Sequence, residues 1–217
     1  MPRYSGSSWR SFRPEAAAAG VAAGPGAPRA PFAVKCRILG LDPGSVRTGY
    51  GLIDCGAGGE RHVTSGCIRA GSGEFPQRLR RIYEAVVLLI EAHRPDEIAI
   101  ERVFVHRNPD SALKLGQARG AAICAALGAG ASAHEYAPRA IKLAVSGYGA
   151  ADKAQVAQMV TALLGLERCP AADAADALAV ALCHAQTRRM AALAAAPAAV
   201  VPARRDRRVS ARSGART

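Results

Sequence analysis

Four acidic residues occur at positions where their carboxylates could act together. Asp42 and Glu101 each end a short apolar run of the kind that forms a buried strand. Asp173 and Asp176 stand three residues apart in an alanine-rich segment, so a helix would place both on one face. Carboxylates held close together repel one another unless cations lie between them. The spacing therefore raises the question of whether the four acids share one cation site.

Each acid also has an ordinary structural explanation when it is considered alone. Asp42 would bond the backbone of the Pro-Gly bend that follows it, as in an Asx turn. Glu101 would mark the point where a strand meets water. Asp173 and Asp176, in the first turn of a helix, would complement its dipole by about 0.3–1 kcal/mol each. These explanations account for the acids singly and leave their common placement unexplained.

A shared site would have a definite chemistry. Ligand sites in open α/β sheets usually lie at strand ends, and a site with only oxygen ligands suits Mg²⁺ or Mn²⁺ rather than zinc. Two such ions, about 3.5–4 Å apart, promote in-line attack on a phosphodiester, one by activating water and the other by stabilising the leaving oxygen. The four acids therefore predict a metal-dependent phosphodiester-cleaving site.

The hydrophobic pattern predicts the elements that must position these acids. Consecutive strands are expected at residues 36–42, 48–54 and 61–70, and their tight links favour an antiparallel meander. A helix over 75–92 leads to a buried strand at 97–101, which a helical crossover makes parallel to its predecessor. The remaining expected elements are a helix at 108–127, a strand at 133–136, helices at 138–145 and 152–164, and a last helix opened by Pro170. This order predicts a mixed α/β sheet, not a doubly wound parallel one.

The positive charge is concentrated at the two ends of the chain. The formal net charge of the 217 residues is +12, which favours a nucleic-acid partner. Residues 1–34 carry four arginines and one acid, and residues 187–217 carry eight arginines and one acid, so ten of the twelve net charges lie there. We expect a disordered N-terminal extension at 1–34, one domain at 35–187 and a basic, disordered tail at 188–217.

Cysteines and histidines show no metal-binding spacing. The six cysteines form no C-x-x-C or zinc-like pattern, so we expect free thiols and a cytoplasmic protein. No role is predicted for His62, His93, His134 or His184. No apolar run reaches transmembrane length, and the N-terminus lacks the compact apolar core of a secretory signal.

Five segments occur in a family-like order and spacing. They are I-L-G-L-D-P-G-S-V-R-T-G-Y-G at 38–51, S-G-C-I-R at 65–69, A-I-E-R-V-F at 99–104, N-P-D-S-A-L-K-L-G-Q-A-R-G at 108–120 and A-D-A-A-D-A-L-A at 172–179. With these segments, the stretch from about 36 to 186 resembles the RuvC family, the bacterial Holliday-junction resolvases of the ribonuclease H-like superfamily. The resemblance implies a mixed five-stranded sheet, with three antiparallel strands followed by two parallel ones, flanked by helices.

The resemblance also implies roles for particular residues. Lys142 and Lys153 match basic residues near the scissile phosphate, and Phe104 matches the aromatic residue that stacks on bases near the crossover. Without the family, the lysines would be read as surface charges and Phe104 as a core residue after a strand. The family's catalytic, metal-binding tetrad is matched by Asp42, Glu101, Asp173 and Asp176.

The implied activity is the resolution of four-way DNA junctions in recombination and repair. A Mg²⁺-dependent endonuclease, with two ions per active site, would leave 5′-phosphate and 3′-hydroxyl ends. Two symmetric nicks require two active sites, so we expect a homodimer, with the small-residue helix at 108–127 in the contact. The resemblance further implies action beside the RuvA–RuvB branch-migration complex.

Three other functions were considered. An actin-like phosphotransferase needs two lobes, for which a core of about 150 residues is too small. A non-cleaving junction-binding module would have no need of four acids. A nuclease of the same superfamily that acts on RNA–DNA hybrids is the nearest alternative.

Overall fold

A five-stranded mixed sheet forms the centre of the chain, in the order β3-β2-β1-β4-β5. The computed structural model describes residues 34–102 and 109–195. The first three strands pair antiparallel, and β4 and β5 continue the sheet parallel to β1. The strands are β1 (Val34–Asp42), β2 (Arg47–Gly56), β3 (Gly59–Arg69), β4 (Glu97–Glu101) and β5 (Ser132–Tyr136).

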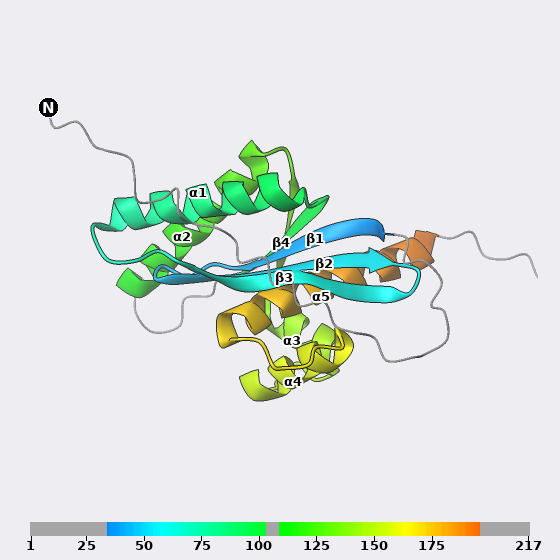
Figure 1. The fold of residues 1–217 in the computed structure, drawn as a ribbon. Helices are drawn as coiled ribbons and strands as arrows, with labels where there is room; N and C mark the ends of the chain where they lie inside the picture. Colours follow the sequence, from blue (N-terminus) through cyan, green and yellow to red (C-terminus); the bar gives the residue numbers. More distant parts are fainter. Residues whose placement is uncertain (1–33, 103–108, 196–217) are drawn as a thin grey trace, which may run out of the picture.

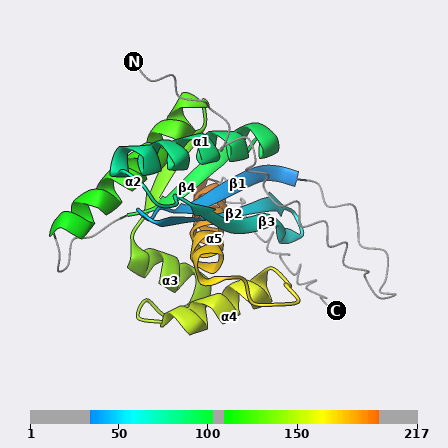
Figure 2. The same cartoon turned by 60° about the vertical axis from the view of Figure 1, so that its left-hand side comes forward.

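Helices cover both faces of the sheet (Figures 1 and 2). On one face lie α1 (Phe75–His93) and α2 (Pro109–Gly128), and on the other lie α3 (Pro138–Ser146), α4 (Lys153–Leu163) and α5 (Ala172–Ala195). The fold class predicted from the sequence, a ribonuclease H-like mixed sheet flanked by helices, is confirmed.

The side chains of the central strands point alternately to the two faces of the sheet, and each face carries its own hydrophobic core. On β4, Ile98 and Ile100 pack with α1 and α2, whereas Ala99 packs on the opposite face under α5. On β1, Leu39 and Leu41 face the first core and Ile38 faces the second. Because successive side chains of a strand point to opposite faces, Asp42, Glu97 and Glu101 are all on the face that α5 covers.

The predicted start of the tail at residue 188 is wrong. Helix α5 continues to Ala195, and Arg188 and Arg189 on it form ion pairs with Glu97 and Glu60. Alanine has the highest helix propensity, and these pairs hold the helix against the sheet, so composition alone misplaced the boundary. The expectations for residues 1–33 and 196–217 lie outside the described residues.

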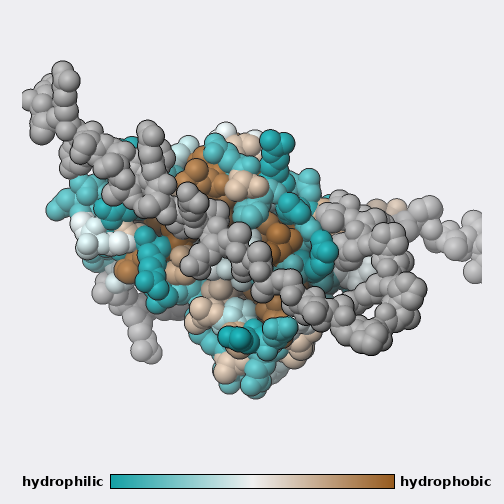
Figure 3. Space-filling model, in the orientation of Figure 1, coloured by the Kyte–Doolittle hydropathy of each residue, from teal (hydrophilic) through white to brown (hydrophobic). Residues whose placement is uncertain are grey.

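On the side seen in Figure 3, hydrophilic residues cover much of the described surface and hydrophobic residues form separate patches. No helix within the described ranges is long and apolar enough to cross a membrane. All six cysteines are free.

Candidate active site

Glycines on β1 and β2 let α5 lie directly on the sheet. A Cβ at Gly40, Gly49 or Gly51 would overlap the backbone or side chains of α5. Two of the facing residues of the helix, Ala177 and Ala181, are small and fully buried. This close approach brings the first turn of α5, with Asp173 and Asp176, to the end of β1.

Asp42 is the last residue of β1, and the turn that follows it is stabilised by Thr48. The Thr48 hydroxyl donates a hydrogen bond to the Gly44 carbonyl oxygen at 3.2 Å and accepts one from the Gly44 N–H at 3.4 Å. The Asp42 carboxyl instead hydrogen-bonds with Glu101. The Asx-turn explanation of Asp42 is therefore replaced by a carboxyl–carboxyl contact.

Glu101 reaches Asp42 because their strands are parallel neighbours. Leu41 pairs with Ile100 in the register of β1 and β4, so the next residue of each strand is an acid at the same edge. Both acids point to the α5 face, where they meet the side chains of the helix.

Burial makes these two carboxyls hard to ionise. Burial and the neighbouring carboxylates, chiefly Asp176 for Asp42 and Asp42 for Glu101, together raise the pKa of Asp42 to about 6 and that of Glu101 to about 7. The charge of Lys153 opposes both shifts. The pair can therefore hold or release a proton near neutral pH.

Two basic side chains pair with the helix acids. Lys153 Nζ lies 2.7 Å from Asp176 Oδ2, and Arg47 Nε lies 2.8 Å from Asp173 Oδ2. Sequence reasoning missed Arg47, whose only signal was its place in the turn five residues after Asp42.

A capping box places Lys153 at the start of α4. The Gln155 N–H donates to Asp152 Oδ1 at 2.8 Å, and the Asp152 N–H donates to Gln155 Oε1 at 3.0 Å. This reciprocal pair satisfies two backbone donors at the helix start. The first residue of α4 is thereby fixed beside the acids of α5.

A small pocket of about 100 Å³ joins the predicted basic residues to the acids. Its polar lining comes from Glu101, Lys142, Lys153 and Asp176. Lys142 is half-buried on α3 and Lys153 is exposed. The structure thus brings six of the seven predicted site residues to one region, and the seventh, Phe104, lies outside the described residues.

The donor set of this region suits a hard divalent cation. All four acids offer only oxygen ligands, the kind that Mg²⁺ and Mn²⁺ prefer. Within the described ranges, the side chains whose ligand atoms gather within 4.8 Å of one another are Glu97, His134 and His184, and not the four acids.

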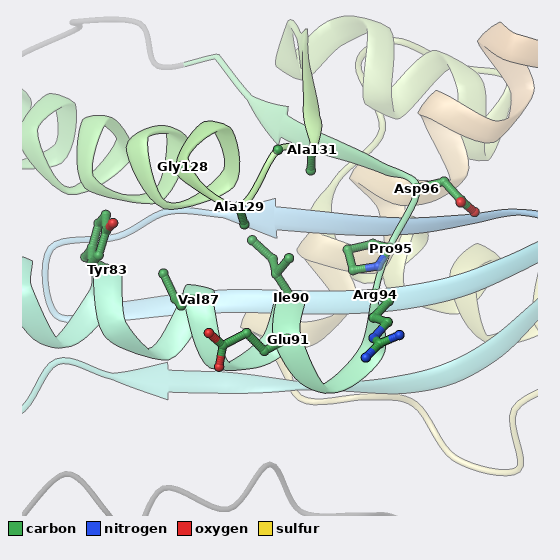
Figure 4. Close-up of a pocket in the computed structure, with 11 residues that line it drawn as sticks. Tyr83, Val87, Ile90, Glu91, Arg94, Pro95, Asp96, Gly128, Ala129 and Ala131 are labelled. Atoms are coloured by element: carbon green, nitrogen blue, oxygen red, sulfur yellow. The ribbon is translucent and has the colours of Figure 1, made fainter.

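A second, wider pocket lies on the opposite face of the sheet. It has a volume of about 580 Å³ and opens between α1 and the end of α2, with Tyr83 and Ile90 on one side and Gly128 and Ala131 on the other (Figure 4). None of the predicted site residues lines it. Its position therefore separates it from the acidic site.

The sequence matches a known family over most of the described chain. The sequence model of the family "Crossover junction endodeoxyribonuclease RuvC" matches residues 38–184. The RuvC protein of Alkalilimnicola ehrlichii is 58% identical over 148 residues, which are 68% of this chain and 90% of that protein. The RuvC protein of Methylococcus capsulatus is 56% identical over 153 residues, which are 70% of this chain and 92% of the relative.

Solved structures show the same fold. The structure of T. thermophilus RuvC in complex with Holliday junction substrate superposes with a TM-score of 0.68 and 35% identity, covering 72% of this chain and 96% of that one. The yeast mitochondrial Holliday junction resolvase Ydc2 superposes with a TM-score of 0.55 at 13% identity, which is a likeness of fold alone.

Proposed function

Because this chain belongs to the RuvC family of crossover junction endodeoxyribonucleases, we propose that it resolves four-way DNA junctions by hydrolysing phosphodiester bonds. The observation that carries the proposal is the meeting of Asp42 and Glu101, at adjacent strand ends, with Asp176 of α5. A site of this kind is suited to metal-dependent phosphodiester hydrolysis. The structure of the relative from T. thermophilus has been solved in complex with Holliday junction substrate.

We assign the catalytic roles to the four acids. Asp42, Glu101, Asp173 and Asp176 would hold Mg²⁺, or Mn²⁺ in its place, through their carboxylate oxygens. When bound, the metal supplies a more acidic attacking water and stabilisation of the developing negative charge. Because burial and neighbouring carboxylates raise the pKa of Asp42 and of Glu101, cation binding would favour the release of protons from this pair.

The basic residues would bind the DNA backbone. Lys153 and Lys142 line the same pocket as Glu101 and Asp176, so a phosphate entering this pocket would lie beside two ammonium groups and the two acids. Phe104 follows Glu101 by three residues, and we propose that it stacks on bases near the crossover. Phosphate contacts position the substrate, whereas stacking on Phe104 would recognise bases that are unpaired at the crossover.

Symmetric cleavage requires two copies of the site. We propose a homodimer that makes paired nicks, leaves 5′-phosphate and 3′-hydroxyl ends, and acts with the RuvA–RuvB complex in recombination and DNA repair. Helix α2 suits the contact, because Leu113 and Leu127 are exposed and the space beside Gly116 and Gly120 is open. Free cysteines throughout the chain support a reducing, cytoplasmic location.

The test compares synthetic substrates. The full chain is incubated with four-way junctions, linear duplexes of the same sequences and RNA–DNA hybrids, with and without Mg²⁺. We expect Mg²⁺-dependent, paired nicks in the junction and little cutting of the duplex. Preferential cutting of the hybrids would support the alternative nuclease function instead.

Amide substitutions test the acids within the same assay. Asp42→Asn, Glu101→Gln, Asp173→Asn and Asp176→Asn each remove a charge with little change in volume, so each variant should bind junctions and cut them orders of magnitude more slowly. Glu84→Gln is the matched control, since Glu84 lies on α1 and pairs with Arg80. A tetrad variant that cuts as fast as this control would remove that residue from the site.

A further inference from the structure

Glu97, His134 and His184 form a second cluster of ligating side chains at the other end of β4. One ligand atom from each residue lies within 4.8 Å of the others. The residues come from three elements: Glu97 begins β4, His134 lies on β5 and His184 lies on α5. Since Glu97 and Glu101 are the two ends of one five-residue strand, the cluster lies roughly 13 Å from the acidic site.

His184 is in close contact with both other members of the cluster. His184 Nε2 lies 2.5 Å from Glu97 Oε2. The His134 ring stacks on that of His184, with centroids 4.4 Å apart and an interplanar angle of 28°. His184 is buried, Glu97 is half-buried and His134 is exposed. The cluster is therefore fixed on its inner side and reachable through His134.

Hydrogen bonds behind His184 hold its ring in place. The Tyr136 hydroxyl lies 2.6 Å from His184 Nδ1, and the Thr187 hydroxyl on the same helix donates to the Cys183 carbonyl oxygen at 2.9 Å. When Nδ1 carries the proton and donates to Tyr136, the Nε2 of a neutral His184 is unprotonated and faces Glu97 Oε2.

Two acceptors in contact need a proton or a metal ion between them. Burial lowers the pKa of His184, which favours the neutral imidazole that metals bind. A second-residue hydrogen bond to the far nitrogen, as Tyr136 provides, is the usual way in which a metal-binding histidine is oriented. The arrangement has the donor set and the support of a transition-metal site.

We propose that Glu97, His134 and His184 bind a zinc-class divalent cation, separate from the cation of the acidic site. Two imidazoles and a carboxylate suit Zn²⁺ or Co²⁺ and disfavour Mg²⁺. Tetrahedral zinc places neighbouring ligand atoms about 3.3 Å apart. To bind zinc, the ligand atoms that lie up to 4.8 Å apart must move closer together, and the His184 Nε2–Glu97 Oε2 distance of 2.5 Å must increase. The exposed side chain of His134 can rotate to allow this.

Arg188 competes with the cation for Glu97. Its Nε lies 2.9 Å from Glu97 Oε2, the same oxygen that faces His184. A dication at this oxygen would repel the guanidinium, which is on the exposed side of α5 and can turn into solvent. Removing this arginine should therefore tighten metal binding, a prediction that a merely structural histidine pair does not make.

The site would join β4 and β5 to the helix that carries two of the acids. His184 follows Asp176 by eight residues on α5, which is about 12 Å along the helix axis. A cation that bridges the strands and this helix would fix how far α5 slides along the sheet. The bound metal is thus structural, and it stabilises the element on which the acidic site depends.

The test measures zinc binding by the full chain in excess Mg²⁺, so that the all-oxygen site is occupied. We expect one zinc per chain by calorimetric titration and a rise of several degrees in the melting temperature. His134→Gln, at an exposed position, should weaken binding at least tenfold and abolish the melting shift. Arg188→Gln should bind more tightly than the natural chain. His62→Gln, outside the cluster and bonded to Ser65, is the matched control and should bind as the natural chain does.

Cobalt distinguishes this cluster from the six cysteines. Co²⁺ bound to two histidines and a carboxylate gives visible bands without a thiolate charge-transfer band. A thiolate band, zinc binding by His134→Gln as tight as that of His62→Gln, or no zinc binding in Mg²⁺ would each overturn the proposal. These readouts do not involve DNA cleavage, so they stand apart from the test of the proposed function.

Discussion

Gly49 of β2 lies directly against the backbone carbonyl of Asp173 on α5, with no room for a side chain between them. Gly49 is also the register partner of Asp42 across the β1–β2 pair. One glycine therefore sets the separation between an acid of the sheet and an acid of the helix. The geometry of the acidic site depends on how closely α5 packs on the sheet.

Substitution of this glycine should displace the helix. In Gly49→Ala, the added Cβ would overlap the Asp173 carbonyl oxygen, so the start of α5 must move away from the sheet. We expect a loss of about 1–3 kcal/mol in the free energy of unfolding and slower junction cleavage at saturating Mg²⁺. Gly128→Ala, where the new Cβ meets only ordinary contacts, should leave cleavage unchanged. Equal cleavage by the two variants would show that the site tolerates a shifted helix.

Lys153 should matter through charge and not through packing. Its ammonium pairs with Asp176 and lowers the pKa of Asp42 and Glu101. Lys153→Gln should slow cleavage by roughly 10²–10³, as for other groups that stabilise developing charge, without raising the Mg²⁺ concentration required. Lys153→Arg should recover part of the rate. Arg80→Gln, which removes the Arg80–Glu84 pair on α1, serves as the control. A cleavage rate near that of the control would show that Lys153 forms a surface ion pair with Asp176 and has no role in catalysis.

The cation-free protein should become less stable as the pH rises. Folding raises the pKa of Asp42 from 3.8 to about 6 and that of Glu101 from 4.5 to about 7. The folded state then binds more protons than the unfolded state, so the contribution is fully present below about pH 4 and is lost as the pH rises through 6 and 7. Melting temperatures measured in EDTA should fall over this window.

Two comparisons check which groups cause the fall of the melting temperature with pH. In saturating Mg²⁺ the slope of melting temperature against pH should become smaller, because the cation binds the deprotonated carboxylates. In the double variant Asp42→Asn, Glu101→Gln it should largely disappear in EDTA. A slope that survives the double variant would come from other groups.

Phe104→Ala tests base stacking near the crossover. Stacking of one base on an aromatic side chain contributes about 1–3 kcal/mol, so we expect weaker junction cleavage with an unchanged melting temperature. Phe75→Ala on α1, whose ring lies under Arg78 on the other face of the sheet, is the matched aromatic-to-alanine comparison and should not affect junction cleavage selectively. A fall of several degrees in the melting temperature of Phe104→Ala would show that Phe104 belongs to the core.

The two ends of the chain should add non-selective affinity. Residues 1–33 and 196–217 carry ten arginines and two acids, and each phosphate neutralised adds about −0.9 to the salt slope of binding. A chain shortened to 34–195, which keeps α5 whole, should bind duplex more weakly and with a shallower salt dependence. It should still cut junctions at low salt. Folding without junction cleavage would show that the ends have a specific role.

Local sequence patterns were enough to predict the elements and the acids. Alternating and helical periodicity placed the strands and helices within a few residues, and strand-end acids stood out because a carboxylate after an apolar run is unusual. Even so, the extent of α5 was misjudged, because its last turns rest on ion pairs with Glu97 and Glu60, residues far away in the sequence.

Contacts between distant segments were decided only by the tertiary structure. Nothing in the local sequence pairs Arg47 with Asp173, or gathers Glu97, His134 and His184 into one cluster. These contacts exist because glycines on β1 and β2 let α5 pack against the sheet, and because the register of β4 and β5 then aligns their side chains with the helix. Periodicity describes which face of an element is buried, whereas the identity of the neighbour on that face is set by how the elements pack.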